Sequence, residues 1–139
     1  MQLADVVATR SNCIRMQVGA IIVKDKRIIA TGYNGTPHGI QNCIDGGCKR
    51  CSDRETNKIN EGKDKEKCIC IHAEQNAIIQ SALHGASTLG GELYSTVEPC
   101  IACSKMIINA GITRVVFREL HHGGAGIKLL KKAGVSIAS

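Results

Sequence analysis

Residues 91–138 read GELYSTVEPCIACSKMIINAGITRVVFRELHHGGAGIKLLKKAGVSIA, and their pattern decides the fold. The apolar runs at 91–97, 112–117 and 135–138 predict three strands. Residues 101–111 and 125–134 predict two helices, which end at Gly111 and Gly134, because glycine is typical just after a helix. An alternation of strand, helix, strand, helix and strand predicts largely parallel pairing with helices on the faces of the sheet.

The N-terminal half predicts a hairpin and two more helices. Residues 18–23 and 28–32 are rich in Val and Ile and are separated by the charged stretch KDKR, which is typical of two paired strands. The first run lacks polar alternation, so we expect it to be buried on both faces. Leu3, Val6 and Val7 have helical spacing before residues 9–13 (TRSNC), and residues 73–84 resume that spacing.

The expected fold class is therefore α/β, with one domain spanning residues 1–139. We expect a three-layer α/β/α sandwich around a mixed five-stranded sheet that begins with the N-terminal hairpin. A chain of 139 residues is long enough for one core and short for two.

Composition narrows the range of functions. No run approaches the roughly 18 apolar residues of a membrane-spanning helix, and residues 1–10 lack the basic start of a signal peptide, so we expect a cytoplasmic protein. A net charge of +6 favours an anionic partner. Tyr33, Tyr94 and Phe117 are the only aromatic residues. Because proteins that bind single strands stack bases on several rings, a small anion is favoured over a nucleic acid.

Residues 34–67 differ from the rest of the chain. They contain several glycines and a proline, and residues 49–67 alone carry seven basic and five acidic side chains. A long loop of this kind inside a compact domain needs something to organise it. The chain has eight cysteines and no export signal, which indicates reduced thiols for metal rather than disulfides. We therefore expect a metal to organise this loop.

A second pattern places metal chemistry at two predicted helix starts. His72-Ala73-Glu74 and the stretch PCIAC at 99–103 each open a helix, with His72 and Cys100 28 positions apart. One imidazole and the thiolates of Cys100 and Cys103 would leave the fourth position of a tetrahedral zinc open for water. Zinc lowers the pKa of such a water from about 15.7 to about 7. Glu74 could then move the proton of that water.

Geometry sets a condition for this site. Side chains two or three positions apart at the start of a helix can reach one metal only if the helix end points at it. Taken alone, H-A-E is usually an exposed helix start, and C-x-x-C is often half of a structural zinc site. Their occurrence together favours a catalytic zinc over a purely structural zinc and over no metal.

The pairing of H-x-E with P-C-x-x-C is the signature of zinc nucleobase deaminases. Residues 18–39, 42–51, 68–78 and 96–117 also resemble the deoxycytidylate (dCMP) deaminase family, and G-Y-N-G at 32–35 is the most diagnostic tract. The resemblance implies a cytidine-deaminase-like fold and hydrolysis of dCMP to dUMP and ammonia, feeding thymidylate synthesis. It also implies homo-oligomers, often hexamers, and in many members activation by dCTP and inhibition by dTTP.

The resemblance further implies roles for single residues. The metal ligands of the catalytic zinc would be His72, Cys100 and Cys103, and the catalytic proton shuttle would be Glu74. The substrate-binding residues would be Asn34, Gly19 and Ala20, with Asn34 on the sugar and the Gly19-Ala20 backbone along the base. Asn34 followed by Gly35 is also typical of a turn with positive φ. The candidates for the phosphate are Arg15, Lys24 and Arg118.

Six further cysteines remain: Cys13, Cys43, Cys48, Cys51, Cys68 and Cys70. Four thiolates would complete one structural zinc, so we expect a second metal bound by four of the six. Cys48 and Cys51 have the spacing of a zinc knuckle. Cys13 and Cys43 match positions that bind a second zinc in some members of the family, although Cys13 could also be a small core residue. Cys68 or Cys70 would complete the set.

Two other functions fit the sequence. One is a deaminase of dCTP, a free nucleoside or tRNA. The other is a zinc module without catalytic activity, which would bind nucleic acid through its net positive charge.

Overall fold

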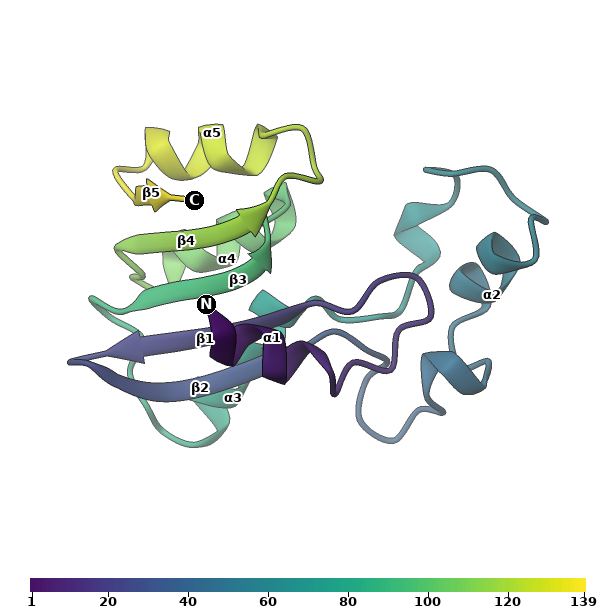
Figure 1. Cartoon of the computed structure of the whole chain (residues 1–139), viewed down its shortest axis with the longest axis horizontal. Coiled ribbons are helices and arrows are strands. Elements are labelled where there is room, and N and C mark those ends of the chain that lie inside the picture. Colours follow the sequence, from purple (N-terminus) through teal and green to yellow (C-terminus); the bar gives the residue numbers. More distant parts are fainter.

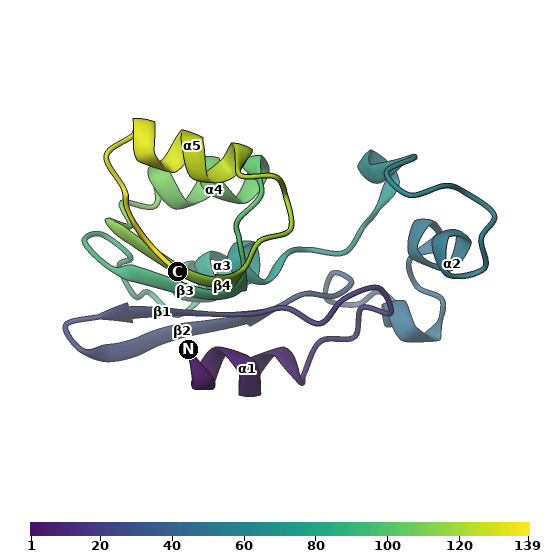
Figure 2. The same cartoon turned by 45° about the horizontal axis from the view of Figure 1, so that its top comes forward.

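The computed structural model describes residues 1–139 and has the expected three-layer α/β/α architecture. Helix α1 (Gln2–Ala8) lies on one face of the sheet. Helices α3 (Ala73–Leu83), α4 (Ile101–Asn109) and α5 (Ala125–Lys132) lie on the other, as Figures 1 and 2 show. None of these helices combines the length and the apolar character needed to cross a membrane.

The sheet is mixed, as the sequence predicts. Its strands are β1 (Gly19–Lys24), β2 (Arg27–Tyr33), β3 (Glu92–Val97), β4 (Arg114–Glu119) and β5 (Ser136–Ala138), in the order β2-β1-β3-β4-β5. β1 is antiparallel to both β2 and β3, whereas β3, β4 and β5 are parallel. The β1–β2 turn at Asp25 and Lys26 has positive φ at both residues, which suits the twist of a two-residue hairpin.

The main core lies between the sheet and helices α3, α4 and α5. Ala20, Ile22 and Leu93 form part of its sheet side, because the register places Ile22 opposite Leu93. Residues 19–22 are all buried, which confirms that β1 is covered on both faces. Since β3 and β4 are parallel, their carboxyl ends meet at one end of the sheet, and α4 begins there just after β3.

Three glycines allow helices to approach the backbone closely. A Cβ on Gly19 would lie 2.1 Å from the carbonyl oxygen of Ala4, and one on Gly32 would lie 2.2 Å from that of Ala73. A Cβ on Gly126 would lie 2.1 Å from the carbonyl oxygen of Pro99. Real Cβ atoms do not come this close to a backbone oxygen, so each contact requires glycine. Two of them, at Gly32 and Gly126, lie against the starts of α3 and α4.

Helix α1 forms where the sequence predicts it, but small residues make its contact with the sheet. Ala4 and Ala8 are buried, whereas Leu3 and Val6 are 55% and 64% exposed. The reason is the close approach at Gly19, which leaves no room for larger side chains between α1 and β1. The large apolar residues therefore face outward.

Residues 36–72 form a separate lobe beside the sheet, which contains α2 (Lys49–Glu55) and two short 3₁₀ turns, Cys43–Asp45 and Lys65–Lys67 (Figure 1). Its only buried residues are Cys43, Cys48 and Cys51. The small number of buried residues is consistent with the expectation that this stretch needs something to organise it, although its helical turns were not expected. Backbone hydrogen bonds between Gly35 and Ile71 close the lobe at its base.

The contact at Gly32 gives the first prediction. In Gly32→Ala the new methyl group would strike the backbone of α3, so we expect a loss of about 3 kcal/mol in the free energy of unfolding. Gly85→Ala is the control, because its Cβ meets nothing and only its positive φ costs about 1 kcal/mol. Urea unfolding of both variants tests this, and equal losses would contradict it.

Candidate active site

Three side chains converge where α3 and α4 begin. His72 is the N-cap of α3, Cys100 is the N-cap of α4, and Cys103 lies in the first turn of α4. His72 Nδ1 lies 3.5 Å from Cys100 Sγ and 3.3 Å from Cys103 Sγ. Zinc bonds of about 2.0–2.1 Å to nitrogen and about 2.3 Å to sulfur give tetrahedral edges of about 3.6 Å. The three atoms therefore fit three corners of a zinc site.

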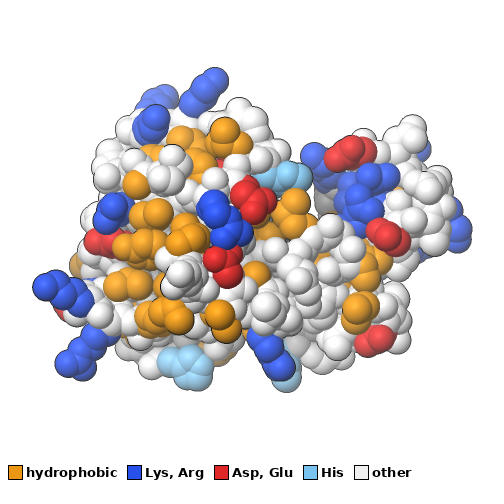
Figure 3. Space-filling model, viewed as in Figure 1, with side chains coloured by type: hydrophobic (Ala, Val, Ile, Leu, Met, Phe, Trp, Pro, Cys, Tyr) orange, Lys and Arg blue, Asp and Glu red, His pale blue; other side chains and the backbone are white.

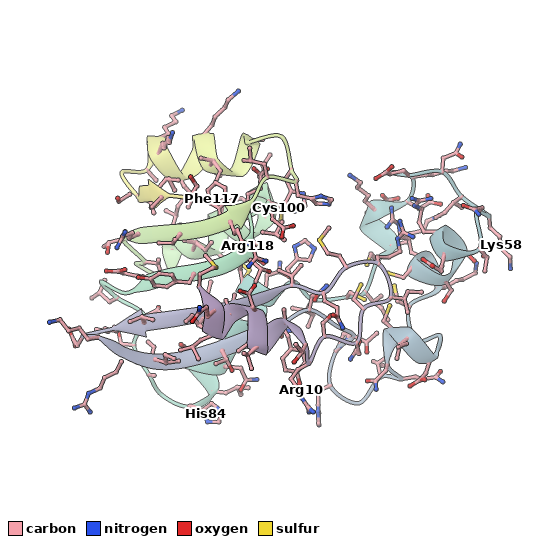
Figure 4. The ribbon with its side chains drawn as sticks, in the orientation of Figure 1. Arg10, Lys58, His84, Cys100, Phe117 and Arg118 are labelled. Atoms are coloured by element: carbon pink, nitrogen blue, oxygen red, sulfur yellow. The ribbon has the colours of Figure 1, made fainter.

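Local contacts hold these residues in place. The backbone N–H of His72 donates to Gln75 Oε1 at 2.9 Å, and the backbone N–H of Cys103 points to Cys100 Sγ at 3.5 Å. Hydrogen bonds from Cys103 and His72 lower the pKa of the Cys100 thiol to about 3. Two helix N-termini aimed at one place add positive potential, which favours thiolates. Figure 4 labels Cys100 at the end of the sheet that faces the lobe.

Glu74 lies directly behind the three ligand atoms. It is 4% exposed, and its carboxylate oxygens lie 3.4 Å from Ser95 Oγ and 3.6 Å from Cys103 Sγ. Burial raises the pKa of the Glu74 carboxyl. A carboxyl group with a raised pKa, next to the open side of a metal site, is suited to accepting and returning a proton.

Sequence reasoning missed Glu98, which is fully buried beside this site. Glu98 Oε1 accepts hydrogen bonds from the backbone N–H groups of His122 at 2.5 Å and Gly124 at 3.0 Å. The loop after β4 is thereby fixed against the start of α4. Burial lowers the pKa of His122, which lies in that loop. The available signal was a charged residue at the end of a buried strand, immediately before Pro99.

The substrate-binding candidates lie at the same end of the sheet. Asn34 has a negative φ, so it is not the positive-φ turn residue that the sequence also allowed. Its side chain accepts from Ser11 Oγ and from the N–H of Val18, and it donates one N–H to the carbonyl of Met16. It therefore ties the segment before β1 to β2, with one amide N–H left over.

The backbone of Gly19 and Ala20 has two different environments. The N–H of Gly19 donates to Thr96 Oγ1 at 3.2 Å, and the residue packs under α1. Ala20 faces the opposite side, where the register pairs it with Ser95. Because Ser95 contacts Glu74, Ala20 lies beside the candidate site.

The three phosphate candidates have different surroundings. Lys24 follows Val23, which pairs with Glu92 at the start of β3, so it lies at the opposite end of the sheet from Cys100. This position rules out Lys24 as a phosphate ligand at the site. Arg15 pairs with Glu55 of the lobe at 2.8 Å. Arg118, labelled in Figure 4, pairs with Asp5 of α1.

The other six cysteines do not join His72. Five of them lie in the lobe and Cys13 lies beside it in the segment before β1; Figure 4 shows sulfur atoms close together there, and none forms a disulfide. Cys68 and Cys70 belong to this group, although only one residue separates Cys70 from His72. The chain between 70 and 72 thus connects two separate groups of metal-binding side chains.

An imidazole, two thiolates and a buried carboxylate at two helix starts make the arrangement of zinc nucleobase deaminases. The chain belongs to the cytidine and deoxycytidylate deaminase family, since the family model of the zinc-binding region matches residues 1–119. It is a zinc-binding domain of that family.

Relatives and solved structures agree with this assignment. The chain is 39% identical over 140 residues to the deoxycytidylate deaminase of Saccharomyces cerevisiae, covering 99% of this chain and 42% of the yeast protein. It is 40% identical over 119 residues to that of Mycobacterium phage D29, covering 83% and 88%. The dCMP deaminase of cyanophage S-TIM5, solved in complex with dCMP and dUMP, has a TM-score of 0.79 and 36% identity over 99% of this chain and 92% of its own.

Glu98 gives the second prediction. In Glu98→Ala the N–H groups of His122 and Gly124 lose their buried acceptor, so we expect a loss of about 2 kcal/mol in unfolding free energy and faster proteolysis of the loop after β4. Glu98→Gln keeps an oxygen acceptor and should lose about half as much. Equal stability of the two variants would contradict the prediction, because it would mean that the side-chain oxygen at position 98 does not hold the loop after β4.

Proposed function

We propose that this chain hydrolyses dCMP to dUMP with release of ammonia, and that it uses a zinc ion to do so. The observation that carries the proposal is the convergence of His72, Cys100 and Cys103 in front of buried Glu74. The complex of the cyanophage relative with dCMP and dUMP supports the choice of substrate and product. The chain spans less than half the length of the yeast relative, so the activity is inferred for this domain.

His72 Nδ1 and the sulfurs of Cys100 and Cys103 would hold the catalytic zinc. The donor set fits the ion, because one imidazole and two thiolates are common zinc ligands and their spacing matches tetrahedral edges. When bound, zinc would supply a water molecule with a pKa near about 7.

Glu74 would carry the protons of the reaction. It would accept one proton from the attacking water and deliver it to the ring nitrogen next to C4. It would then pass the second proton to the amino group, which leaves as ammonia while C4 gains its carbonyl oxygen. Burial raises the pKa of the Glu74 carboxyl, so the group can hold a proton between these steps.

The substrate would lie between β1 and the candidate site. Support comes from Ala20, which lies next to Ser95 and Glu74 and would contact the base together with the backbone of Gly19. The remaining amide N–H of Asn34 would donate to the sugar. A net charge of +6 favours a substrate that carries phosphate.

Ammonia release tests the substrate. We expect turnover of dCMP to exceed that of dCTP, cytidine, deoxycytidine and tRNA, measured with the zinc-loaded chain. Preference for a substrate without phosphate would overturn the choice of dCMP.

Adding dCTP or dTTP to the same assay shows whether the chain responds to these effectors, as many family members do. Unchanged rates of dCMP turnover would exclude that regulation.

Glu74→Gln separates catalysis from a purely structural zinc. The amide cannot accept the water proton, so we expect dCMP turnover to fall by about 1,000-fold. Zinc content should not change, because Glu74 is not a ligand. Glu92→Gln, at an exposed ion pair with Arg114, is the control and should remain active. A fully active Glu74→Gln would reject the proton-transfer role.

We further propose that copies of this chain associate through the face that carries α1, in reducing surroundings such as the cytoplasm. Hydrophobic side chains gather on this face in Figure 3, and Leu3 and Val6 of α1 point outward from it. Tyr94 and Val116 lie on the same side of the sheet and are only partly covered. Cysteines placed in groups that could bind a metal as thiolates support a reducing compartment.

Sedimentation velocity tests the association. We expect the unmodified chain to sediment as an oligomer, and a Leu3→Asp, Val6→Asp double variant to sediment as a monomer, since charges would replace the apolar contact. Leu83→Asp is the control, because Leu83 is 71% exposed on the opposite face and should leave the assembly intact. A monomeric unmodified chain would contradict the proposal.

A further inference from the structure

The five cysteines of the lobe and Cys13, which lies beside it in the segment before β1, form two groups that overlap. One group is Cys13, Cys43, Cys51 and Cys70; the other is Cys48, Cys51, Cys68 and Cys70. Within each group all four sulfurs lie within 4.8 Å of one another. Cys51 and Cys70 belong to both groups. The lobe thus offers two four-sulfur sites that share an edge.

The sulfur spacing suits metal coordination. Four thiolates at about 2.3 Å from a zinc ion lie about 3.8 Å from one another at the corners of a tetrahedron. Cys68 Sγ lies 3.8 Å from both Cys48 Sγ and Cys51 Sγ. A disulfide is excluded at this distance, because its sulfurs would be about 2.05 Å apart.

The shared residues lie between the two other pairs. The sulfur of Cys70 lies within 4.8 Å of the sulfur of Cys13 in one group and of Cys68 in the other. The sulfur of Cys51 lies 3.8 Å from that of Cys68, and within 4.8 Å of the sulfurs of Cys43 and Cys48. A thiolate has several lone pairs on sulfur and can therefore bind two metal ions at once. Cys51 and Cys70 are placed to do this.

We propose that the lobe binds two zinc ions in one dinuclear cluster of six thiolates. Cys51 and Cys70 bridge the two ions. Cys13 and Cys43 complete the first ion, and Cys48 and Cys68 complete the second. This goes beyond a single structural zinc, and it does not depend on the catalytic activity proposed above.

A single metal ion would leave two of the six cysteines without a metal. If it occupied the first group, Cys48 and Cys68 would remain as thiols at tetrahedral spacing with no ion. If it occupied the second group, Cys13 and Cys43 would be left, and the segment before β1 would not be tied to the lobe. Since Cys43, Cys48 and Cys51 are the only buried residues of the lobe, metal bonds to all the segments that carry them replace a hydrophobic core.

Charge is compatible with the cluster. On binding, the six thiols would release six protons, and two divalent ions with six thiolates carry a net charge of −2, the same as one ion with four thiolates. Basic side chains flank these cysteines in the sequence, including Arg50 before Cys51 and Lys67 before Cys68. The surroundings therefore tolerate the additional ion as well as they would a single one.

The metal content of the purified, fully reduced chain tests the proposal. We expect three zinc ions per chain by mass spectrometry of the metal, one at His72 and two in the lobe. Two or fewer zinc ions per chain would overturn it. An iron–sulfur cluster in place of zinc would overturn it as well.

Nuclear magnetic resonance of the cadmium-113-substituted chain tests the bridging directly. The β-protons of Cys51 and Cys70 should each couple to two cadmium ions, and those of the other four cysteines to one. If every cysteine coupled to a single ion, the shared-thiolate arrangement would be wrong even with the expected metal count.

Two terminal variants distinguish the cluster from either single-ion site. We expect Cys13→Ser and Cys48→Ser each to lose at least one zinc ion per chain, because each removes a ligand of a different ion. With a single ion in the lobe, one of the two variants would keep its full zinc content, and that result would reject the cluster. Ser52→Ala, next to Cys51 on α2, is the control and should bind as much zinc as the unmodified chain.

Discussion

The two helices that begin at the candidate active site, α3 and α4, each pack directly on the backbone of a glycine, and this site depends on these two contacts. Gly32 of β2 lies against the first turn of α3, and Gly126 of α5 lies against the start of α4. A methyl group at either position would overlap a carbonyl oxygen. Because no side chain separates the elements, the two helix N-termini can meet at one end of the sheet. His72 and Cys100 then need only short side chains to reach one ion.

The second constraint is the segment that joins the lobe to α3. Cys70 belongs to the sulfur group of the lobe, Ile71 forms the backbone bridge to Gly35, and His72 begins the helix. Anything that displaces the lobe therefore acts on His72 through two peptide units. The cysteine groups and the candidate active site share no metal ligand, but the backbone from Cys70 to His72 connects them.

The sequence predicted most of the fold because local patterns carry it. The hairpin and the parallel strands follow from apolar runs and turn residues, and so do the helices α4 and α5, which are followed by the positive-φ residues Gly111 and Gly134. Local patterns could not predict which side of α1 is buried, because that depends on a contact with Gly19, which is distant in the chain. The helical spacing of large apolar residues suggested that their face of α1 would be buried. In the structure the buried residues are Ala4 and Ala8, because only small side chains fit between α1 and the sheet.

The residues of the candidate site also differ in whether the sequence could predict them. His72, Glu74 and Cys100 could be grouped from their spacing at helix starts, and the structure brings these side chains together. Glu98 could not be assigned, because its partners are backbone N–H groups in a loop more than twenty residues away. The composition of the lobe has a consequence for the heat capacity of unfolding. The fully buried residues of the lobe are all cysteines, so opening it exposes little aliphatic carbon and adds little to this heat capacity. The temperature dependence of stability therefore comes mainly from the sheet and its helices.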